Sequence, residues 1–422
     1  MRTKHWKLMS KGAMVLAIAT LSAGCGAASA QGNNSSGVVT ITLSGWTSSP
    51  VEAQLMTKEL GYFEKAYPKI HVNYRPISGN YEALLKTRFV AGDAPDVIYV
   101  NNGGESSTFI ANKDLIPLNH YIKSSHFPIQ DFYSSALSLF SSHGQIYGIP
   151  KDQSPLALFY NKTLFQKAGI TAPPTTWAEL AADAKALTKP ALHQYGLINS
   201  VQEPRWAEFL LESGGGVMNA AMTRMTLTSP ASLQGYRFFV NLYRDHYATT
   251  PPTVGAQWGG QAFGMGDAGM VVSGNWLVPF LNQTYPHTQF GIVPMPKGPV
   301  NAETLTFPVA YGITKDSLHP QASWTLIRYL TSKQGMTKWM NLGLALPVRP
   351  SLINLPYYAQ HPVLQGLIAD LPQSQAWTFP PGFVEYVTTT MTNQTTLVID
   401  GRESARQALK VMQQDGTQLL GQ

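Results

Sequence analysis

Residues 147–189 read YGIPKDQSPLALFYNKTLFQKAGITAPPTTWAELAADAKALTK, and the elements of this stretch decide the fold class. Leu156–Tyr160 is a short apolar run, which predicts a buried strand. Residues 162–168 follow it with the pattern of a short helix that ends at Gly169. A strand that leads directly into a helix is typical of α/β proteins, so the stretch favours that class.

A second helix is predicted after Pro173 and Pro174, which interrupt the chain. Thr176 is placed to cap its N-terminus, and Glu179, three residues later, completes the pattern of a capping box. Apolar residues then recur at helical spacing at Trp177, Leu180, Ala181, Ala184 and Leu187. The stretch therefore predicts a strand, a helix, an extended link and a second helix.

Predicted strands and helices alternate on both sides of this stretch. Before it, strands and helices are expected in turn at residues 38–45, 52–67, 70–74, 81–91 and 97–100. After it, strands are expected at 195–198, 289–293 and 310–314, and helices at 233–247, 321–330, 335–342, 386–397 and 404–420. This alternation predicts α/β units with a largely parallel sheet.

Several motifs resemble those of one protein family. Y-N-K-x-L-F-x-K-A-G at 160–169, followed by P-P-x-T-W-x-E-L at 173–180, resembles the hallmark of the family 1 extracellular solute-binding proteins, the maltose-binding-protein-like receptors of ABC importers. G-D-A-P-D-V at 92–97 and the segments 263–276 and 341–350 are similar to further motifs of that family, in the same order. The resemblance spans residues 38–422.

The resemblance implies an α/β, two-lobed periplasmic-binding-protein fold of class II type, with a hinge and a ligand cleft between the lobes. A chain of 422 residues is also too long for one compact core. The first crossing between the lobes is expected near Lys151–Pro155. The expected boundaries are 38–151 plus 300–331 for the N-terminal lobe and 152–299 plus 332–422 for the C-terminal lobe.

The glycines of the segment 263–276 have a second interpretation. Gly264, Gly266 and Gly269 form G-x-G-x-x-G, the spacing of a dinucleotide-binding loop. Such a loop needs a strand before it and an acidic residue about 20 positions after it, and the sequence predicts neither. The segment resembles instead the F-x-x-G-x-A-A-M…G-x-W segment of the solute-binding family, so no cofactor is expected.

The first residues predict export. Four basic residues precede an uncharged, mostly apolar run, so residues 1–24 are predicted to be a signal peptide. L-S-A-G-C at 21–25 resembles a lipobox, which makes Cys25 the predicted lipid attachment site and 25–37 a lipidated, flexible tether on the outer face of the cytoplasmic membrane. Cleavage after Ala30, at an A-x-A site, is the alternative, and it would give a secreted soluble protein.

The charge balance argues against a nucleic-acid partner. The chain has 30 basic and 24 acidic residues, and four basic ones lie in the signal peptide, which leaves 26 against 24. Charged residues make up only 13% of the chain, about half of the usual share. A surface poor in carboxylates changes little in acid, so exposure to an acidic medium is one explanation, and compositional drift is the other.

No catalytic or metal-binding motif stands out. The sequence lacks G-x-S-x-G, a Walker loop and H-E-x-x-H, and its ten histidines show no ligand spacing. Cys25 is the only cysteine, so neither a disulfide nor a cysteine metal site is expected. We therefore expect no catalytic residue and no metal. A glycosidase that uses Asp152 and Glu203 as its two carboxylates is the enzyme alternative.

Candidate ligand-binding residues are chosen by position and by resemblance. Aromatic rings cover the apolar faces of sugars, carboxylates and amides bind their hydroxyl groups, and clefts open at the carboxyl ends of strands in α/β sheets. The residues that fit are Trp46, Thr47, Tyr81, Glu82, Asn101, Asn102, Asp152, Glu203, Trp206, Trp276 and Tyr311. Packing or capping is an equal alternative for all of them except Trp276 and Glu203.

Trp276 falls on the sugar-stacking tryptophan of the resembling family. It follows the apolar run 270–272, where Gly274 permits a sharp turn and Asn275 is placed to cap a helix that begins at Trp276. Glu203 falls on a glutamate that binds sugar in the maltose receptor, and Arg205 replaces the tyrosine that follows there. Maltose itself is not the expected ligand, because a Trp, an Asp and an Arg of that receptor are replaced by Val100, Gly103 and Gly104.

The resemblance implies capture of a sugar or oligosaccharide by hinge closure and its delivery to an ABC transporter permease. The expected partners are a small-molecule saccharide, the permease subunits and the membrane through the N-terminal lipid, with the protein itself a monomer. The alternatives are a binding protein for a polyamine, phosphodiester or metal complex, and a secreted glycosidase.

Overall fold

The computed structural model describes residues 37–47, 50–77, 79–102, 104–341 and 346–421. The elements below belong to one unit of the chain, Val38–Gln422. None of the helices among the described residues has the length and hydrophobicity needed to span a bilayer. The signal peptide 1–24, Cys25 and most of the tether 25–37 lie outside the described residues and stay predictions.

The first sheet contains five strands in the order β2-β1-β3-β13-β6. Its strands are β1 Val39–Ser44, β2 Ile70–Tyr74, β3 Val97–Asn101, β6 Gly148–Asp152 and β13 Val309–Ile313. β1 runs parallel to β2 and β3, whereas β13 is antiparallel to both of its neighbours, β3 and β6.

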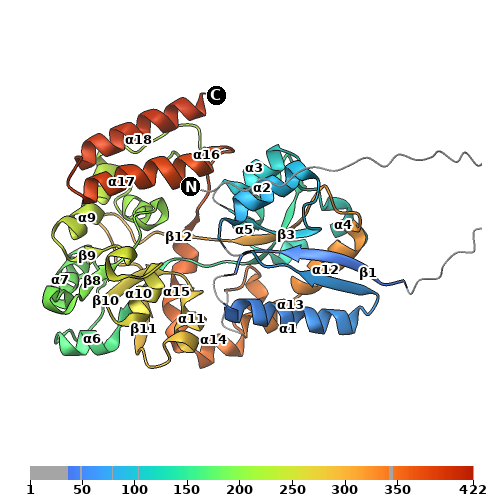
Figure 1. Cartoon of the computed structure of the whole chain (residues 1–422), viewed down its shortest axis with the longest axis horizontal. Helices are drawn as coiled ribbons and strands as arrows, with labels where there is room; N and C mark the ends of the chain where they lie inside the picture. Colours follow the sequence, from blue (N-terminus) through green and yellow to red (C-terminus); the bar gives the residue numbers. More distant parts are fainter. Residues whose placement is uncertain (1–36, 48–49, 78, 103, 342–345, 422) are drawn as a thin grey trace, which may run out of the picture. The chain divides into compact units, whose positions relative to one another are not determined.

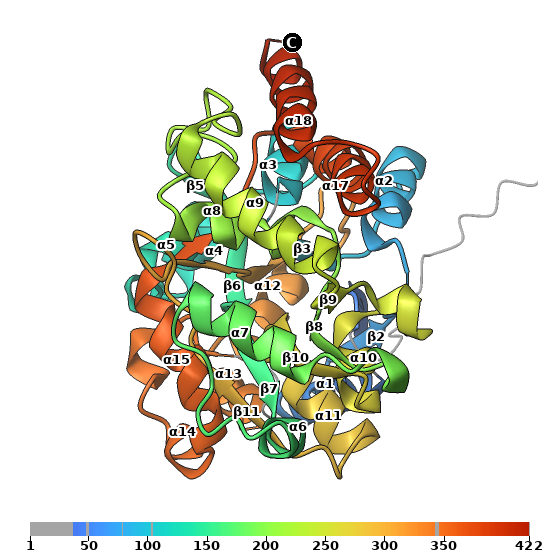
Figure 2. The same ribbon diagram turned by 90° about the vertical axis from the view of Figure 1, so that its left-hand side faces the viewer.

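The second sheet also contains five strands, in the order β11-β7-β10-β8-β9. Its strands are β7 Ala157–Asn161, β8 Tyr195–Ile198, β9 Ala248–Thr249, β10 Ala268–Ser273 and β11 Phe290–Val293. β8 runs parallel to β9 and β10, and β7 is antiparallel to β10 and β11. Figure 2 shows β8 and β10 side by side.

The prediction of a largely parallel sheet is wrong for the strands next to the connections between the sheets. In the first sheet β13 lies between β3 and β6 and is antiparallel to both, and in the second sheet β7 lies between β10 and β11 and is antiparallel to both. An apolar pattern reports the burial of a strand and not its direction, so the sequence carried no signal for these antiparallel pairs.

Most of the longer helices begin within a few residues of the predicted positions, whereas several of the shorter ones were not predicted. The longer ones are α1 Pro50–Ala66, α2 Tyr81–Ala91, α7 Trp177–Leu187, α9 Pro230–Arg244, α11 Leu277–Thr284, α12 Pro320–Leu330, α13 Lys333–Met340, α17 Thr392–Ile399 and α18 Ala405–Leu420. The shorter ones are α3 Glu105–Ala111, α4 Asn119–Ser124, α5 Ser134–Ser138, α6 Lys162–Lys167, α8 Ala207–Glu212, α10 Gly259–Met265, α14 Pro356–Gln360, α15 Gln365–Asp370 and α16 Phe383–Glu385, and a π-helical segment spans Tyr386–Met391. Helices α9, α17 and α18 pack on one another (Figure 1).

The local structure of residues 147–189 is as predicted. Asn161 caps α6 by accepting a hydrogen bond from Leu164 N, and Gly169 follows the helix with a positive φ of 73°. Thr176 and Glu179 form the predicted capping box at the start of α7. The capping box satisfies two backbone N–H groups that the first turn of a helix leaves without partners.

Short strands and bridges tie the connecting segments together. β12 Thr304–Thr306 lies between β11 and β13 in the sequence and pairs with β14 Ser374–Ala376. Two isolated antiparallel bridges join Pro155 to Thr306 and Gln153 to Leu346. Residues 152–156 join β6 to β7, and residues 304–308 lead from the second sheet back to β13. We call these two stretches the crossing segments. The lobe boundaries expected from the sequence remain a prediction. Helix α13 packs on α1 and α12.

Two hydrophobic clusters use opposite faces of the second sheet. Phe159 and Val271 belong to the cluster that also contains the core of the first sheet. Leu158 and Met270, their neighbours along the same strands, belong to the other cluster. Because successive side chains of a strand point to opposite faces, a strand that is covered on both faces reads as a continuous apolar run.

Candidate functional site

Side chains from both sheets and from the crossing segments enclose a cavity of about 280 Å³, which we call the cleft cavity. Its lining includes residues at the ends of β1, β3 and β6, residues in the turn after β10, and one residue each from α1 and α13. The lining residues are Trp46, Glu52, Asn101, Lys151, Asp152, Ser154, Trp276, Phe307, Val309 and Trp339.

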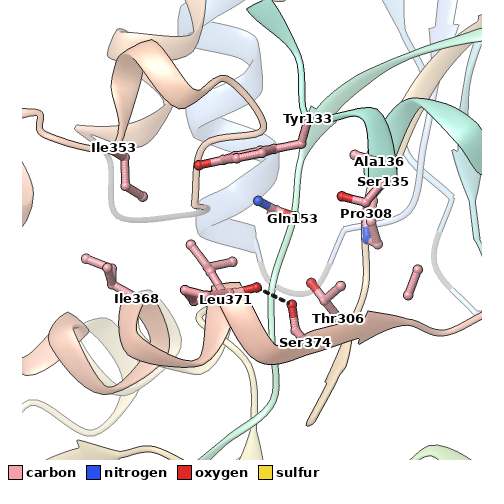
Figure 3. A pocket seen from close by; sticks show the side chains of 12 residues that line it. Tyr133, Ser135, Ala136, Gln153, Thr306, Pro308, Ile353, Ile368, Leu371 and Ser374 are labelled. Carbon is pink, nitrogen blue, oxygen red and sulfur yellow. Dashed lines mark hydrogen bonds between the residues drawn. The ribbon is translucent and has the colours of Figure 1, made fainter. Parts of the chain in front are cut away.

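A larger cavity of about 480 Å³, the back cavity, is lined by other residues of the same crossing segments (Figure 3). Tyr133 and Gln153 line it together with the segment that leads into β14. Leu371 and Ser374 belong to that segment, and the Ser374 Oγ donates a hydrogen bond to the Leu371 carbonyl at 2.9 Å.

Alternation along the crossing segments separates these two cavities. Asp152 and Ser154 line the cleft cavity, whereas Gln153 lines the back cavity. On the second crossing segment, Phe307 lines the cleft cavity and Thr306 lines the back cavity. Because extended chain directs successive side chains to opposite sides, the cleft cavity and the back cavity lie on opposite sides of these segments.

Trp46 brings an indole to the cleft cavity from the first sheet. It follows β1 and is held edge-on by two buried tyrosines, Tyr81 at 5.3 Å and Tyr99 at 5.4 Å between ring centroids. The Tyr81 hydroxyl donates a hydrogen bond to the Tyr99 carbonyl at 2.9 Å, which fixes that ring in turn. Edge-to-face pairs of this kind orient an indole before any ligand arrives.

Trp276 brings a second indole to the same cavity from the second sheet. A Cβ on Gly274 would lie 2.2 Å from the Trp276 ring and 2.4 Å from the Ser154 Oγ. Glycine is therefore required here for close packing. The predicted cap is wrong in its position, because α11 begins at Leu277 and Trp276 itself occupies the N-cap position. The Asn275 backbone N–H donates to the Ser154 Oγ at 3.0 Å, which ties the turn to the crossing segment.

A buried ion pair forms the polar part of the cleft cavity. The Lys151 ammonium binds the Oδ2 oxygen of Asp152, and it lies 4.7 Å from the Tyr99 ring centroid and 4.9 Å from the Trp339 ring centroid. The Trp339 Nε1 donates a hydrogen bond to the same Oδ2 at 3.1 Å. Among the described residues nothing binds Asp152 Oδ1, so this oxygen is available to accept a hydrogen bond from a ligand hydroxyl group.

Four of the predicted site residues line the cleft cavity together: Trp46, Asn101, Asp152 and Trp276. The structure also adds residues that sequence reasoning missed, namely Glu52, Lys151, Ser154, Phe307, Val309 and Trp339. Lys151 lies one residue before the predicted hinge residue Asp152, and Ser154 lies two residues after it. The predicted crossing was therefore the sequence signal that could have pointed to these two lining residues. Trp339 had no such signal, because it lies 187 residues beyond Asp152.

The other predicted residues of the first sheet do not line the cleft cavity. Tyr81 and Tyr311 are buried and pack against Tyr99 or Trp46. Asn102 is fully buried, and its Nδ2 donates to the Thr306 carbonyl at 3.2 Å. Glu82 forms an ion pair with Lys86 at 2.7 Å on α2. Thr47 is half-buried beside Trp46 in sequence and is not part of the lining.

The two predicted residues of the Q-E-P segment are both buried. Trp206 packs edge-on against Tyr236 inside the second cluster. The Glu203 carboxylate accepts a hydrogen bond from Trp377 Nε1 at 2.6 Å, and burial raises its pKa to about 8. Glu203 therefore favours its protonated form at neutral pH, bonds to the segment after β14 and does not line the cleft cavity.

The site can hold a flat, hydroxylated ligand. Two indoles supply apolar surfaces, and the Lys151–Asp152 pair with Asn101 and Ser154 supplies donors and acceptors around them. No group of three or more His, Cys, Asp or Glu side chains in the described part of the chain is arranged to hold a metal ion.

Comparison with known proteins identifies relatives of this fold. The sequence profile of the bacterial extracellular solute-binding protein family matches residues 46–337. A binding protein of Brucella abortus is 25% identical over 356 residues, which cover 79% of this chain and 84% of the relative. The multiple sugar-binding protein of Streptococcus mutans is 23% identical over 304 residues, which cover 66% of this chain and 68% of the relative.

A solved structure confirms the predicted two-lobed α/β fold. The ABC substrate-binding protein from Listeria monocytogenes, in complex with cycloalternan, superposes with a TM-score of 0.84. The match covers 90% of this chain and 99% of the Listeria chain, at 22% sequence identity. At this identity the likeness concerns the fold, and the ligand of the Listeria protein belongs to that protein.

Proposed function

The chain belongs to the bacterial extracellular solute-binding protein family, and we propose that it captures a saccharide and delivers it to the permease of an ABC transporter. The observation that carries this proposal is the position of Trp46 and Trp276, which reach one cavity from different sheets. Two aromatic faces with carboxylate, amide and hydroxyl groups around them suit the apolar faces and polar edges of a sugar ring.

The relatives support a saccharide as the ligand. The Streptococcus mutans relative is a multiple sugar-binding protein, and the Listeria structure contains cycloalternan. The alternative of a polyamine would call for an acidic cavity, but Lys151 is paired with Asp152 inside the cleft cavity. With Glu52 as the one further charged residue of the lining, the cavity holds two acidic residues and one basic residue, which is little negative charge for a polycation to bind, so the saccharide is the better proposal.

The mechanism follows from the connections between the sheets. A ligand that contacts Trp46 on the first sheet and Trp276 on the second gains both contacts only when the two sides are close together. Such differential contact favours the closed conformation of a hinged protein, and a permease can then recognise the closed form. The crossing segments that carry Asp152 and Phe307 would act as the hinge.

Binding in this proposal involves no chemical change of the ligand. The matched family and the relatives named above are binding proteins. Glu203, which the glycosidase alternative needs, is bonded to Trp377 and does not line the cleft cavity with Asp152. A glycosidase requires two carboxylates that face one substrate bond, about 5 to 10 Å apart.

We also propose that the protein acts outside the cytoplasmic membrane, attached to its outer face through a lipid on Cys25, and that it works as a monomer. A soluble secreted form, cleaved after Ala30, is the alternative. The support for attachment is the L-S-A-G-C sequence that ends the predicted signal peptide.

A thermal-shift screen over mono- and oligosaccharides tests the proposal. A ligand at 100 times its Kd stabilises a protein by about 2.7 kcal/mol, so a specific sugar is expected to raise the melting temperature. The product of each incubation is then analysed for cleavage, and unchanged sugar is expected. A polyamine or phosphodiester that stabilises the protein when no sugar does would contradict the saccharide proposal. Cleaved sugar would contradict binding without catalysis.

A further inference from the structure

A third cavity, of about 510 Å³, lies at the carboxyl ends of β8, β9 and β10. Its lining includes polar residues directly after these strands, namely Asn199, Ser200, Thr250 and Ser273. Arg205 also lines it, so we call it the Arg205 cavity. Ser273, the last residue of β10, lines the Arg205 cavity, and Trp276, three residues later, lines the cleft cavity.

Arg205 is half-buried, and the carboxyl group of Glu208 is the neighbouring charge that acts on its pKa. It lies in the 3-10 turn Glu203–Arg205, where its backbone N–H bonds to the Gln202 carbonyl at 3.0 Å. The Nη1 atom is buried without a hydrogen-bond partner, and no ion pair involves this guanidinium within the described residues. An arginine stays protonated in proteins, so a buried guanidinium needs acceptor atoms close to it.

Glu208 is the neighbouring carboxyl group that can meet part of this need, because its buried Oε2 atom also has no hydrogen-bond partner among the described residues. Glu208, the acidic neighbour that acts on the pKa of Arg205, accepts a hydrogen bond from the Thr304 Oγ1 at 3.1 Å. Burial raises the pKa of Glu208 and that of Glu203 to about 8, and the guanidinium of Arg205 lowers that of Glu208. A guanidinium has five N–H donors, so one carboxyl group leaves donors for a guest. Asp400 is exposed where it lines the cavity, and water screens its charge.

A second unpartnered donor lines the same cavity. The Nδ2 atom of Asn199 is buried and has no hydrogen-bond partner among the described residues. The backbone carbonyl of Asn199 accepts a hydrogen bond from the Tyr243 hydroxyl at 3.0 Å, which fixes the residue at the end of β8. Two unpartnered donor atoms, the Nη1 of a charged guanidinium and the Nδ2 of an amide, favour a guest rich in acceptor oxygens.

An aromatic ring completes this cavity. Trp258 lines it and packs against Phe280 with 4.9 Å between ring centroids. A Cβ on Gly260 would lie 2.2 Å from the Trp258 ring, so glycine at this position lets the indole take its place. An indole beside a guanidinium suits a sugar ring that carries an oxyanion.

We propose that the Arg205 cavity receives an anionic group of the captured saccharide, with Arg205 as the counter-ion and Asn199 as a second donor. The ligand class is therefore an acidic saccharide, in which the oxyanion is a carboxylate or a phosphate. This inference rests on the proposed function, because the ligand is the saccharide that we propose for the cleft cavity. The Arg205 cavity would receive the charged end of that saccharide.

Titration calorimetry on the full-length protein with matched ligands tests this inference. The probes are galactose, galacturonate and galactose 6-phosphate, and their di- and trisaccharide counterparts where these exist, with inorganic phosphate alone as a further arm. The acidic members are expected to bind at least tenfold more tightly than the neutral ones. The ratio of galacturonate to sugar phosphate affinity distinguishes a carboxylate from a phosphate ligand. Raising the NaCl concentration should weaken only the acidic ligands.

Substitutions of Arg205 test whether its guanidinium group causes the preference for acidic over neutral ligands. Arg205→Gln should remove the preference for acidic ligands and leave the affinity for neutral ones, whereas Arg205→Lys should keep part of it. Arg224→Gln removes an exposed arginine that lines none of these three cavities, and it should change nothing. If Arg205→Gln does not fold, a reduced preference for acidic ligands in Arg205→Lys still assigns that preference to the guanidinium, and an unchanged preference overturns the inference.

The outcomes that overturn this inference are distinct from those that overturn the proposed function. Equal affinity for neutral and acidic saccharides, or a preference that survives in Arg205→Gln, overturns the acidic ligand and leaves saccharide capture intact. Inorganic phosphate that binds as tightly as the sugar phosphate overturns it too, since the cavity would then hold a free ion. Binding of no saccharide at all overturns both proposals.

Discussion

Trp46 and Trp276 line one cavity although each follows a strand of a different sheet. Each ring is held by its own sheet: Trp46 packs edge-on against Tyr99 of β3, and Trp276 lies over Gly274 directly after β10. The distance between the two indoles therefore depends on the angle between the two halves of the fold. A flat ligand contacts both indoles only when the two halves are at the right angle. Substitutions of these two residues therefore test ligand capture directly.

The first prediction concerns the buried ion pair of the cleft cavity. Asp152→Asn leaves the Lys151 ammonium buried without its counter-ion, and we expect the free energy of unfolding to fall by about 3–5 kcal/mol. Lys151→Met combined with Asp152→Asn should recover most of this loss, because no isolated charge remains. Urea denaturation of the two single variants and the double variant measures the coupling.

Ligand affinity should behave differently from stability in the same variants. The double variant still lacks the Asp152 carboxylate, so its affinity for the saccharide should stay weak although the fold has recovered. If the stability loss of the double variant equals the sum of the losses of the two single variants, Lys151 and Asp152 are not coupled. Full recovery of affinity would show that Asp152 does not contact the ligand.

The second prediction concerns pH. Burial raises the pKa of Glu105, Glu203 and Glu208 to about 8 each, whereas their ordinary value is 4.5. Between these values the native state holds protons that the unfolded chain has released, so stability falls as the pH rises towards 8. We expect a higher free energy of unfolding at pH 5 than at pH 8, by at least about 1 kcal/mol for each such group, and therefore a higher urea midpoint at pH 5.

Glu203→Gln is the matched control for this pH dependence. Glutamine accepts the hydrogen bond from Trp377 without a titrating proton, so the variant should show a shallower slope of stability against pH. A midpoint that rises from pH 5 to pH 8 would contradict the prediction. The expected direction agrees with the low charged fraction of the sequence, 13%, which also predicts little loss of stability in acid.

Local features of this fold were predictable and distant pairings were not. The capping box of Thr176 and Glu179 was recognised because the two residues are three apart and need no other part of the chain. Trp339 was missed because its bond to Asp152 joins residues that are 187 positions apart. No periodicity or motif in the sequence predicts the contact between Trp339 and Asp152, because it forms only when α13 packs beside the first sheet.

Glu203 illustrates the limit of reasoning from position. The resemblance assigned its carboxylate to the ligand, and the structure places Glu203 in the 3-10 turn Glu203–Arg205 after β8. The structure pairs that carboxylate with Trp377, 174 residues later. Position along a strand can be read from a pattern, but the partner of a side chain depends on which distant segment packs beside it.

The third prediction concerns attachment, and it is motivated by Cys25 at the end of the predicted signal peptide. Cys25→Ser should release the protein from the membrane fraction, because the acceptor of the lipid is lost, while ligand affinity stays unchanged. Fractionation and immunoblotting measure the distribution. A wild-type protein that is already soluble and begins at Gln31 would show that cleavage follows Ala30.

The most direct test of saccharide capture is the calorimetric affinity of Trp46→Ala, Trp276→Ala and their double variant for the sugar that the screen identifies. Each single variant should lose about 1–3 kcal/mol of binding free energy, from the aromatic surface that covers the ligand. The unfolding midpoint of the free Trp276→Ala protein should change little, because the indole is only half-buried. Trp177→Ala, outside the cleft cavity, should instead lose stability and keep its affinity. Unchanged affinity in both Trp46→Ala and Trp276→Ala, or a loss of about 3–5 kcal/mol in the stability of the free Trp276→Ala protein, would contradict a sugar held between the two indoles.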